Sequence, residues 1–286
     1  MRQKKDEKNQ SRIILVPIGG LANRMRAIAS GWSLAKAVKK QFIVVWHKNF
    51  ELNASFNKLF KDDLPFNIIE PNDFIYNCCY EFPRKKNLFI SHILKNLKGI
   101  SNYLYISYEY EPDQLCDIIK KAKGDIVIHS GLQFYDFDPK ILVELFRFSD
   151  MVISTERLIL KDYQPQYAIQ IRRTDNKMSI NNSPLELFER IIVTNIEKSP
   201  QSKFFLATDD KNIKKYFFQK YPLNIIYNPN NVTRNTLEGM IDAAAEFCIM
   251  AECPIIYGSY WSSFSEIAAL YGNTRLIVVS KDILDI

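Results

Sequence analysis

Short apolar runs alternate with helix-like repeats along most of the chain, and this alternation predicts an α/β protein. In the first 50 residues an apolar run, a helical repeat and a second apolar run follow one another, which predicts a β-turn-α-β unit with parallel strands. These three segments are Ile13–Ile18, Ala22–Lys40 and Phe42–Trp46. A further strand is expected at Asp125–Ser130, followed by helices over Pro139–Phe148 and Ser149–Lys161.

The second half of the chain alternates more regularly. Strands are expected at Tyr167–Arg172, Lys203–Ala207, Asn224–Tyr227, Pro254–Tyr257 and Arg275–Val279, with helices at Pro184–Lys198, Lys211–Lys220, Thr236–Ala251 and Ser263–Tyr271. Five strands with four intervening helices predict a doubly wound parallel sheet. The polar segment Lys161–Gln166 is the expected boundary, which gives domains over residues 13–162 and 163–286.

Composition narrows the class of protein. Of 286 residues, 47% are hydrophobic and 24% are charged, which is typical of a chain that buries a large core. Five of the basic residues lie in Met1–Arg12, so we expect residues 1–12 to form a flexible basic tail that folding does not need. The net charge of +6 is scattered and no recognition motif is present, so we expect no nucleic-acid partner.

The cysteine pattern and the lengths of the apolar runs indicate the cellular compartment in which the protein is expected. The five cysteines are an odd number and form no CxxC motif, which predicts reduced thiols rather than a disulfide framework or a zinc site. The charged tail does not resemble a signal peptide, and no apolar run has membrane-spanning length. We therefore predict a cytoplasmic protein.

One segment, Arg84–Ile100, carries five basic residues and no acidic one. Its apolar residues Ile90, Ile93, Leu94 and Leu97 have helical spacing, which predicts a basic amphipathic helix. Such a helix could make a peripheral contact with an anionic membrane surface or an acidic acceptor. The other interpretation, which is the more common one for such a pattern, is a helix that packs on the core with its lysines in solvent.

Polar clusters follow three of the expected strands in the second half. Arg172 and Arg173 come directly after one strand, Asp209 and Asp210 after the next, and Ser262–Ser263 after a third. Because ligands bind beyond the carboxyl ends of parallel strands, we expect these groups to meet at one edge of the sheet. The planar forks of two arginines suit a diphosphate, although they could instead pair with acidic neighbours.

The serines and the aspartates each allow a simpler interpretation. Ser262 and Ser263 stand at a helix start, where hydroxyl and N–H groups either hold a phosphate or cap the helix. Asp209 and Asp210 could bind a metal ion, but Asp210 could equally be an N-cap. A Ser–His–Asp triad is unsupported, because GxSxG is absent and the second half has no histidine.

The turn after the first strand reads GGLANR. Gly19 and Gly20 would let a ligand approach the backbone at the start of the following helix. They could also be there only because the turn is tight. The turn matches neither the P-loop nor the GxGxxG pattern.

Taken together, these motifs resemble the fucosyltransferase superfamily. The motifs GGLANR, IRRTD, FFLATDD and GSYWSSFSEIAALYG, with Asp242 on the helix before the last, follow in the order found in these enzymes. The α1,6-fucosyltransferases, including the nodulation enzymes, are the most similar, and the α1,2- and protein O-fucosyltransferases share the skeleton. The resemblance covers the glycine turn and most of residues 167–272, but not residues 50–160.

The resemblance implies a GT-B fold, in which two Rossmann-like domains face each other across a cleft that holds GDP-fucose. It implies an inverting enzyme that needs no metal, with an acceptor-side N-terminal domain and a nucleotide-sugar-binding C-terminal domain. It places Arg172 at the donor phosphates as a catalytic residue. The other donor-side positions are Gly19, Gly20, Asn23, Arg173, Asp209, Asp210, Asp242, Ser262 and Ser263.

Two departures leave the general base unassigned. The family often has histidine two residues before the first arginine, where this chain has Gln170, and the α1,6 enzymes have a proposed catalytic glutamate where this chain has Ile180. His129 and His47, at strand ends of the first domain, are candidate bases, although either could be an ordinary packing or surface histidine. Asp175 is expected to orient the arginines.

The function expected from the sequence is transfer of fucose from GDP-fucose to a glycan hydroxyl, without a cofactor or metal. Two alternatives remain open at this point. The chain could use another nucleotide sugar, or it could bind a sugar nucleotide without catalysis.

Overall fold

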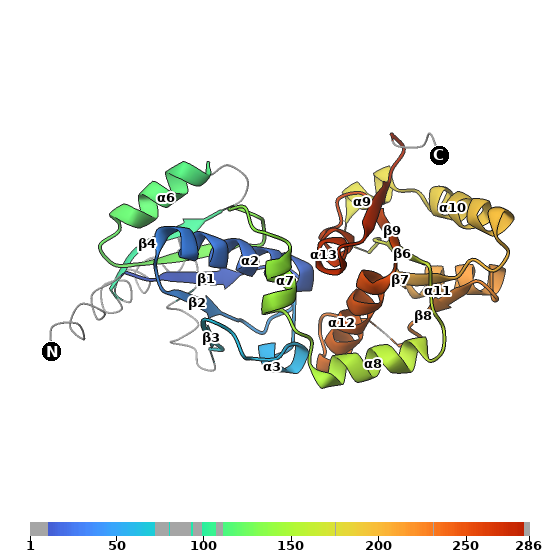
Figure 1. Cartoon of the computed structure of the whole chain (residues 1–286), viewed down its shortest axis with the longest axis horizontal. Helices are drawn as coiled ribbons and strands as arrows, with labels where there is room; N and C mark the ends of the chain where they lie inside the picture. The colour runs from blue at the N-terminus through green and yellow to red at the C-terminus, as the bar shows by residue number, and fades with distance from the viewer. Residues whose placement is uncertain are drawn as a thin grey trace. The chain divides into compact units, whose positions relative to one another are not determined.

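The computed structural model describes residues 11–71, 80, 93, 99–106, 111–174, 176–230 and 232–282. The chain divides into two compact units, and each contains one five-stranded sheet (Figure 1). The N-terminal unit comprises Met1–Asn57 and Lys61–Phe146, and the C-terminal unit comprises Lys58–Phe60 and Arg147–Ile286. The predicted α/β fold with two Rossmann-like units is confirmed.

All strand pairs of the N-terminal sheet are parallel, in the order β3-β2-β1-β5-β4. The strands are β1 (Ile13–Pro17), β2 (Phe42–Val45), β3 (Asn67–Ile69), β4 (Ile100–Tyr105) and β5 (Asp125–Ser130). β1, β2 and β5 are buried along their whole length, which is why they are continuous apolar runs in the sequence. The predicted β-turn-α-β unit is confirmed.

The helices of the N-terminal unit follow the predicted pattern where the sequence is regular. Among the described residues they are α2 (Leu21–Val38), α6 (Pro112–Lys121) and α7 (Lys140–Leu145), while the short α3 (Phe56–Leu59) is divided between the two units. The predicted amphipathic helix Arg84–Ile100 lies outside the described residues except at Ile93, Gly99 and Ile100. Its predicted end is wrong, because Ile100 is the first residue of β4, where it pairs with β5.

The C-terminal sheet is also parallel, in the order β10-β9-β6-β7-β8. Its strands are β6 (Tyr167–Ile171), β7 (Phe204–Thr208), β8 (Ile225–Tyr227), β9 (Ile255–Ser259) and β10 (Arg275–Val279). Counted within the unit, this is the order 3-2-1-4-5 of a mononucleotide-binding Rossmann fold. The strand order reverses between β6 and β9, and a crevice for a ligand is expected at that point.

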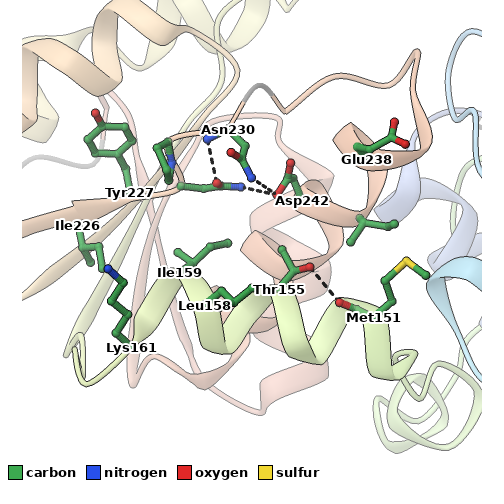
Figure 2. Close-up of a pocket in the computed structure, with 13 residues that line it drawn as sticks. Met151, Thr155, Leu158, Ile159, Lys161, Ile226, Tyr227, Asn230, Glu238 and Asp242 are labelled. Carbon is green, nitrogen blue, oxygen red and sulfur yellow. Dashed lines mark hydrogen bonds between the residues drawn. The ribbon is translucent and has the colours of Figure 1, made fainter.

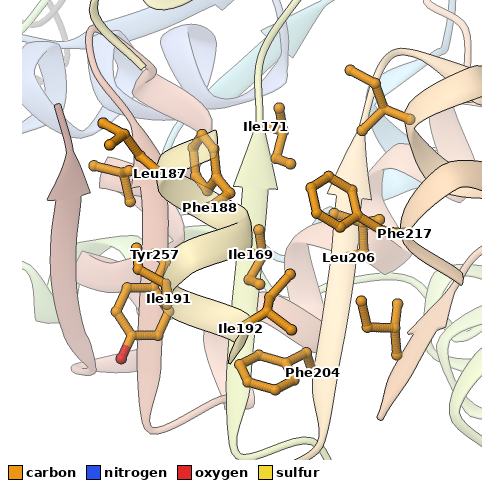
Figure 3. Close-up of a cluster of buried hydrophobic side chains, with 13 residues drawn as sticks. Ile169, Ile171, Leu187, Phe188, Ile191, Ile192, Phe204, Leu206, Phe217 and Tyr257 are labelled. Carbon is orange, nitrogen blue, oxygen red and sulfur yellow. The ribbon is translucent and has the colours of Figure 1, made fainter. Parts of the chain in front are cut away.

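Helices cover both faces of the C-terminal sheet. They are α8 (Asp150–Leu160), α9 (Lys177–Asn182), α10 (Leu185–Lys198), α11 (Lys211–Lys220), α12 (Leu237–Glu252) and α13 (Ser263–Gly272). The alternation in β6 sorts its side chains, because Ile169 and Ile171 pack with Phe188 of α10 and Phe217 of α11 (Figure 3). Burying one such phenylalanine contributes roughly 1.5–3 kcal/mol, so this face fixes the position of β6.

The border between the units differs from the predicted one. The compact units divide at Phe146 and Arg147, whereas the sequence placed the boundary in Lys161–Gln166. The reason is that α8 packs against α12 of the C-terminal unit. Ser149, which caps α8, also donates a hydrogen bond of 2.8 Å to the Lys58 carbonyl, and this brings Lys58–Phe60 into the same unit.

No helix in the described part of the chain combines the length and the apolar composition needed to cross a bilayer.

Candidate functional site

The three predicted polar clusters of the C-terminal unit lie at one edge of its sheet. Ile171 of β6 pairs with Thr208 of β7, and Gln170 pairs with Gly258 of β9, so the three strands end at nearly the same level. Arg172 and Asp209 follow the first two strands and Ser259 ends the third. The edge therefore brings these residues together at the switch point between β6 and β9.

Arg172 is held at this edge by both neighbouring strands. Its backbone N–H donates to Ser259 Oγ at 2.9 Å, and that hydroxyl in turn donates to the Gln170 carbonyl at 3.1 Å. Its guanidinium Nη1 lies 2.6 Å from Asp209 Oδ2, and both side chains are less than one-fifth exposed. A guanidinium has five N–H donors, so a planar fork is fixed at the switch point while one arm pairs with Asp209.

Arg173 has a different environment from Arg172. Its guanidinium donates to the Arg172 carbonyl at 2.9 Å and to the Ser183 carbonyl at 2.8 Å. Burial lowers the pKa of Arg173, and Asp209, Glu186 and Asp210 partly oppose that shift. These contacts favour a role in holding the backbone around Arg172 over direct contact with a ligand.

Asp209 and Asp210 are adjacent in sequence but their carboxylates accept hydrogen bonds from different partners. Asp209 accepts from the Arg173 N–H at 2.9 Å and from the Thr174 hydroxyl at 2.7 Å, in addition to pairing with Arg172. Asp210 is the N-cap of α11 and accepts from the Asn212 N–H at 2.8 Å. Across the described residues, no group of three or more His, Cys, Asp or Glu could hold a metal ion. Asp175, predicted to orient the arginines, lies outside the described residues.

The start of α13 adds backbone donors to the same unit. Ser262 is its N-cap residue, Ser263 is the first helical residue, and the Ser262 side chain makes no capping hydrogen bond. The first N–H groups of a helix and its dipole favour an anion. The hydroxyls of Ser262 and Ser263 therefore stand at a helix start that begins four residues after Ser259.

In the N-terminal unit, hydrogen bonds from Arg24 connect the glycine turn to the segment that follows β2. Gly19 has a φ of 84°, and an added Cβ would lie 2.8 Å from Asn23 Nδ2, so glycine is required there. The guanidinium of Arg24 donates to the Gly19 carbonyl at 2.9 Å, to the His47 carbonyl at 2.6 Å and to Asn49 Oδ1 at 2.9 Å. Burial lowers the pKa of Arg24 to about 10.

The rest of that turn is engaged as well. Glu51 accepts from the Gly19 N–H at 2.9 Å, and Gly20 is the N-cap of α2. Asn23 Oδ1 accepts from Arg26 at 3.0 Å. The tight-turn interpretation of Gly19 is thus supported by its backbone, while the ligand role of Gly19, Gly20 and Asn23 stays a prediction.

His129, the first candidate base, is buried within β5 with 4% of its surface exposed. Its Nε2 lies 2.6 Å from the Tyr80 carbonyl, and a carbonyl only accepts, so this nitrogen carries the proton and donates. This environment favours the interpretation that His129 is an ordinary packing histidine rather than the general base. His47 is partly buried, and its carbonyl accepts from Arg24.

Asp242 lines a pocket of about 560 Å³ between α8, the end of β8 and α12 (Figure 2). Its Oδ1 accepts from Asn228 Nδ2 at 3.1 Å and from Asn230 Nδ2 at 3.0 Å. The walls include Leu158 and Tyr227, so an apolar slot ends in a carboxylate and two amides. This volume, with a mostly apolar lining and a few polar groups, is within the range of small-molecule sites.

A buried ion pair supports that polar wall. Lys214 of α11 donates to Glu246 of α12 at 2.8 Å and to the Asn228 carbonyl at 3.1 Å, and the two side chains are 5% and 3% exposed. Burial raises the pKa of Glu246 to about 7, although Lys214 opposes that shift. The pair thereby fixes Asn228, which in turn donates to Asp242.

Sequence reasoning missed three of these residues. Ser259 was seen only as part of a serine-rich motif, because its bond to Arg172 joins positions 87 residues apart. Arg24 had a signal, as an arginine between the buried residues Ala22 and Met25 of α2. Lys214 had a weaker one, because α11 is rich in lysine and only the structure shows which one is buried.

The strand order defines a Rossmann-like α/β protein, and the arginines lie at the edge of the sheet where such folds bind their ligands. No protein-family model matches this sequence, and no curated protein sequence matches it either. Solved structures do match, and fucosyltransferases are among them. A crystal structure of NodZ α1,6-fucosyltransferase soaked with GDP-fucose is 15% identical with a TM-score of 0.59, covering 92% of this chain and 93% of that one.

Two further similar structures span the same superfamily. A variant of Arabidopsis thaliana FUT1 in complex with GDP is 16% identical with a TM-score of 0.60, covering 94% of this chain and 70% of that one. POFUT1 in its apo form is 11% identical with a TM-score of 0.59, covering 95% and 98%. At these identities the similarity shows the fold, and this chain has the fold of the fucosyltransferases.

Proposed function

We propose that this protein is an inverting glycosyltransferase that transfers fucose from GDP-fucose to a glycan hydroxyl. The observation that carries the proposal is the fixed guanidinium of Arg172 at the switch point of a Rossmann sheet. The fold and the GDP and GDP-fucose in similar structures support the choice of donor. In this proposal the C-terminal unit binds the nucleotide sugar, and the N-terminal unit provides most of the acceptor contacts.

The proposed reaction is a single displacement. The acceptor hydroxyl oxygen forms a bond to the anomeric carbon of the sugar, and the bond from that carbon to the phosphate oxygen breaks, so GDP leaves with the electron pair. Arg172 and the N–H groups at the start of α13 would stabilise the charge that grows on the diphosphate. Ser262 and Ser263 would hold the same phosphates through their hydroxyls.

The proton of the acceptor hydroxyl has no assigned base. Ile180, at the position of the proposed glutamate in the α1,6 enzymes, is a 40% exposed side chain on α9 that cannot take a proton. His129 is buried and donates through Nε2. We infer that stabilising the leaving GDP contributes more to the rate than removing the proton does.

The Asp242 pocket is the proposed site of the guanine base. Guanine presents adjacent N–H donors on one edge, and a carboxylate accepts from both. The oxygen Oδ1 is already oriented by Asn228 and Asn230, so Asp242 is held ready to accept. The apolar walls, among them Ile159, would pack against the flat ring (Figure 2).

A panel of nucleotides should rank the bases. A ligand that binds only the folded state stabilises it by about 2.7 kcal/mol at a hundredfold excess over Kd. Among GDP, UDP, ADP and CMP, GDP should raise the melting temperature most, as measured by thermal shift. Arg172→Ala should abolish the shift, while Arg275→Ala, at the opposite end of the sheet, should keep it. A larger shift with UDP would refute the choice of donor.

Hydrolysis without acceptor separates an enzyme from a binding protein. Slow release of fucose from GDP-fucose, with little mannose from GDP-mannose, is expected for the proposed transferase. A GDP shift without any release of sugar would instead favour a non-catalytic sugar-nucleotide binder.

Activity should persist in excess chelator. Asp209 is committed to Arg172, Arg173 and Thr174, and Asp210 caps α11, so the two carboxylates do not converge on one ion. Fucose release, measured with and without EDTA, should change less than twofold. Loss in EDTA with recovery on adding Mg²⁺ or Mn²⁺ would show that these aspartates are metal ligands after all.

A further inference from the structure

Trp261 lies in the loop between β9 and α13 with its indole mostly in solvent. The side chain is 58% exposed, and the residue has a φ of 57°. A bulky residue in the left-handed region costs roughly 1–3 kcal/mol and persists only where the surroundings impose it. Here burial of the ring does not offset that cost.

Three hydrogen bonds impose this conformation. Asn176 Nδ2 donates to the Trp261 carbonyl at 3.0 Å, and Ser179 Oγ donates to the Tyr260 carbonyl at 2.6 Å. On the other side of that residue, the Tyr260 N–H donates to Ser183 Oγ at 2.8 Å. Hydrogen bonds therefore connect the loop to both ends of α9, and the backbone that carries the exposed indole is held in one conformation.

Trp261 is a close neighbour in the chain of the residues proposed to hold the donor diphosphate. Ser259, which binds the Arg172 backbone, lies two residues before Trp261, and Ser262 and Ser263 at the start of α13 follow directly. A diphosphate is recognised by positive charge and N–H donors, and the apolar face of an indole offers it neither. Trp261 therefore lies close in the chain to the groups proposed to hold the diphosphate, and its exposed ring is accessible to a molecule attached to, or reacting with, that diphosphate.

We propose that Trp261 is the platform on which a sugar ring of the glycan acceptor stacks. The inference rests on the proposed function and names the chemistry of its acceptor side. A pyranose ring has one face of C–H groups, and an indole offers a large, rigid apolar surface with an N–H at its edge. The donor sugar has the same chemistry, so the experiment must distinguish the two rings.

Trp261→Gly is the most informative variant, because glycine removes the ring and adopts a positive φ without strain. Its melting temperature should equal or exceed that of the wild type. Leu223→Ala is the matched control, since Leu223 is 86% exposed in the same unit and precedes β8. A single exposed leucine of this kind is ordinary on a protein surface.

The test uses the full chain with GDP-fucose and the best acceptor found by fucose transfer on a glycan array. Trp261→Gly should raise the acceptor KM about tenfold or more, the scale of 1.4 kcal/mol. Donor hydrolysis without acceptor should stay within twofold, and Trp261→Phe should recover most of the loss. Leu223→Ala should resemble the wild type in every assay.

Three results would refute the proposal that Trp261 stacks on the acceptor sugar. The acceptor KM of Trp261→Gly could equal that of the wild type, or its donor hydrolysis could fall as much as transfer, which would assign the ring to the donor sugar. The wild type could also hydrolyse GDP-fucose and yet fucosylate nothing on the array. By contrast, a wild type that neither binds GDP nor releases fucose would refute the proposed function itself.

Discussion

Replacing Arg172 with lysine should lower transferase kcat/KM by about 10²–10³ and leave the melting temperature within a few degrees of the wild type. Lysine keeps the positive charge, but it is a point donor and cannot present a planar fork to two phosphate oxygens. Lysine can still pair with Asp209 through its charge, and the Arg172 backbone bond to Ser259 does not need the side chain.

The matched control is Arg275→Lys. Arg275 begins β10, so it lies at the opposite edge of the same parallel sheet, and its replacement should not change activity. Rates of fucose release and transfer measure the effect on activity, and thermal melting of each variant measures the effect on stability. An Arg172→Lys enzyme of wild-type activity would exclude Arg172 as the phosphate clamp.

Replacing Lys214 with methionine should have the largest effect on stability. The change leaves the Glu246 carboxylate and the Asn228 carbonyl buried without their donor. Breaking a buried pair in this way costs about 3–5 kcal/mol, which corresponds to a fall in melting temperature on the order of 10 °C. Chemical and thermal denaturation of the purified variant measure this loss.

The loss should also depend on pH. Glu246 already has a raised pKa of about 7 in the folded protein, and removing Lys214 takes away the influence that lowers it. A carboxyl group that holds its proton more tightly when folded stabilises the fold below its unfolded pKa of about 4.5, and this contribution is lost as pH rises through the folded pKa. The variant should therefore be closer to the wild type at pH 5 than at pH 8.

A double variant distinguishes two causes of the lost stability, the unpaired buried carboxylate of Glu246 and the loss of side-chain packing. Adding Glu246→Leu to Lys214→Met removes the unpaired carboxylate and should recover at least half of the stability, with little dependence on pH. If the single variant melts with the wild type, the buried pair does not support the fold.

The elements that sequence predicted best are those buried on both faces or strictly periodic. β6 and β7 appear within one residue of their predicted bounds, because alternation marks β6 and a buried apolar run bounded by polar residues marks β7. α9 was missed because its sequence, KMSINN, has no apolar repeat and its residues favour caps and turns. β3 was missed because it has only three residues.

The unit to which α8 belongs could not be predicted for a related reason. An amphipathic pattern shows that one face of a helix is buried, but it does not show against which partner. The convergence of the arginine, aspartate and serine segments was predictable, since parallel strands share an edge. The division of labour between Arg172 and Arg173, or between Asp209 and Asp210, depends on side-chain directions that only tertiary contacts set.

The strand order has a consequence for how the protein reaches its native state. β6 lies between β7, which follows it closely in the chain, and β9, whose Ser259 meets Arg172 across 87 positions. Closing so long a loop is entropically costly, so pairings of this kind slow folding. During synthesis β6 and β7 can associate early, but the Arg172 backbone has no serine partner until β9 has left the ribosome. In the proposed function, capture of GDP during refolding would thus report the final docking of β9 rather than the first collapse of the sheet.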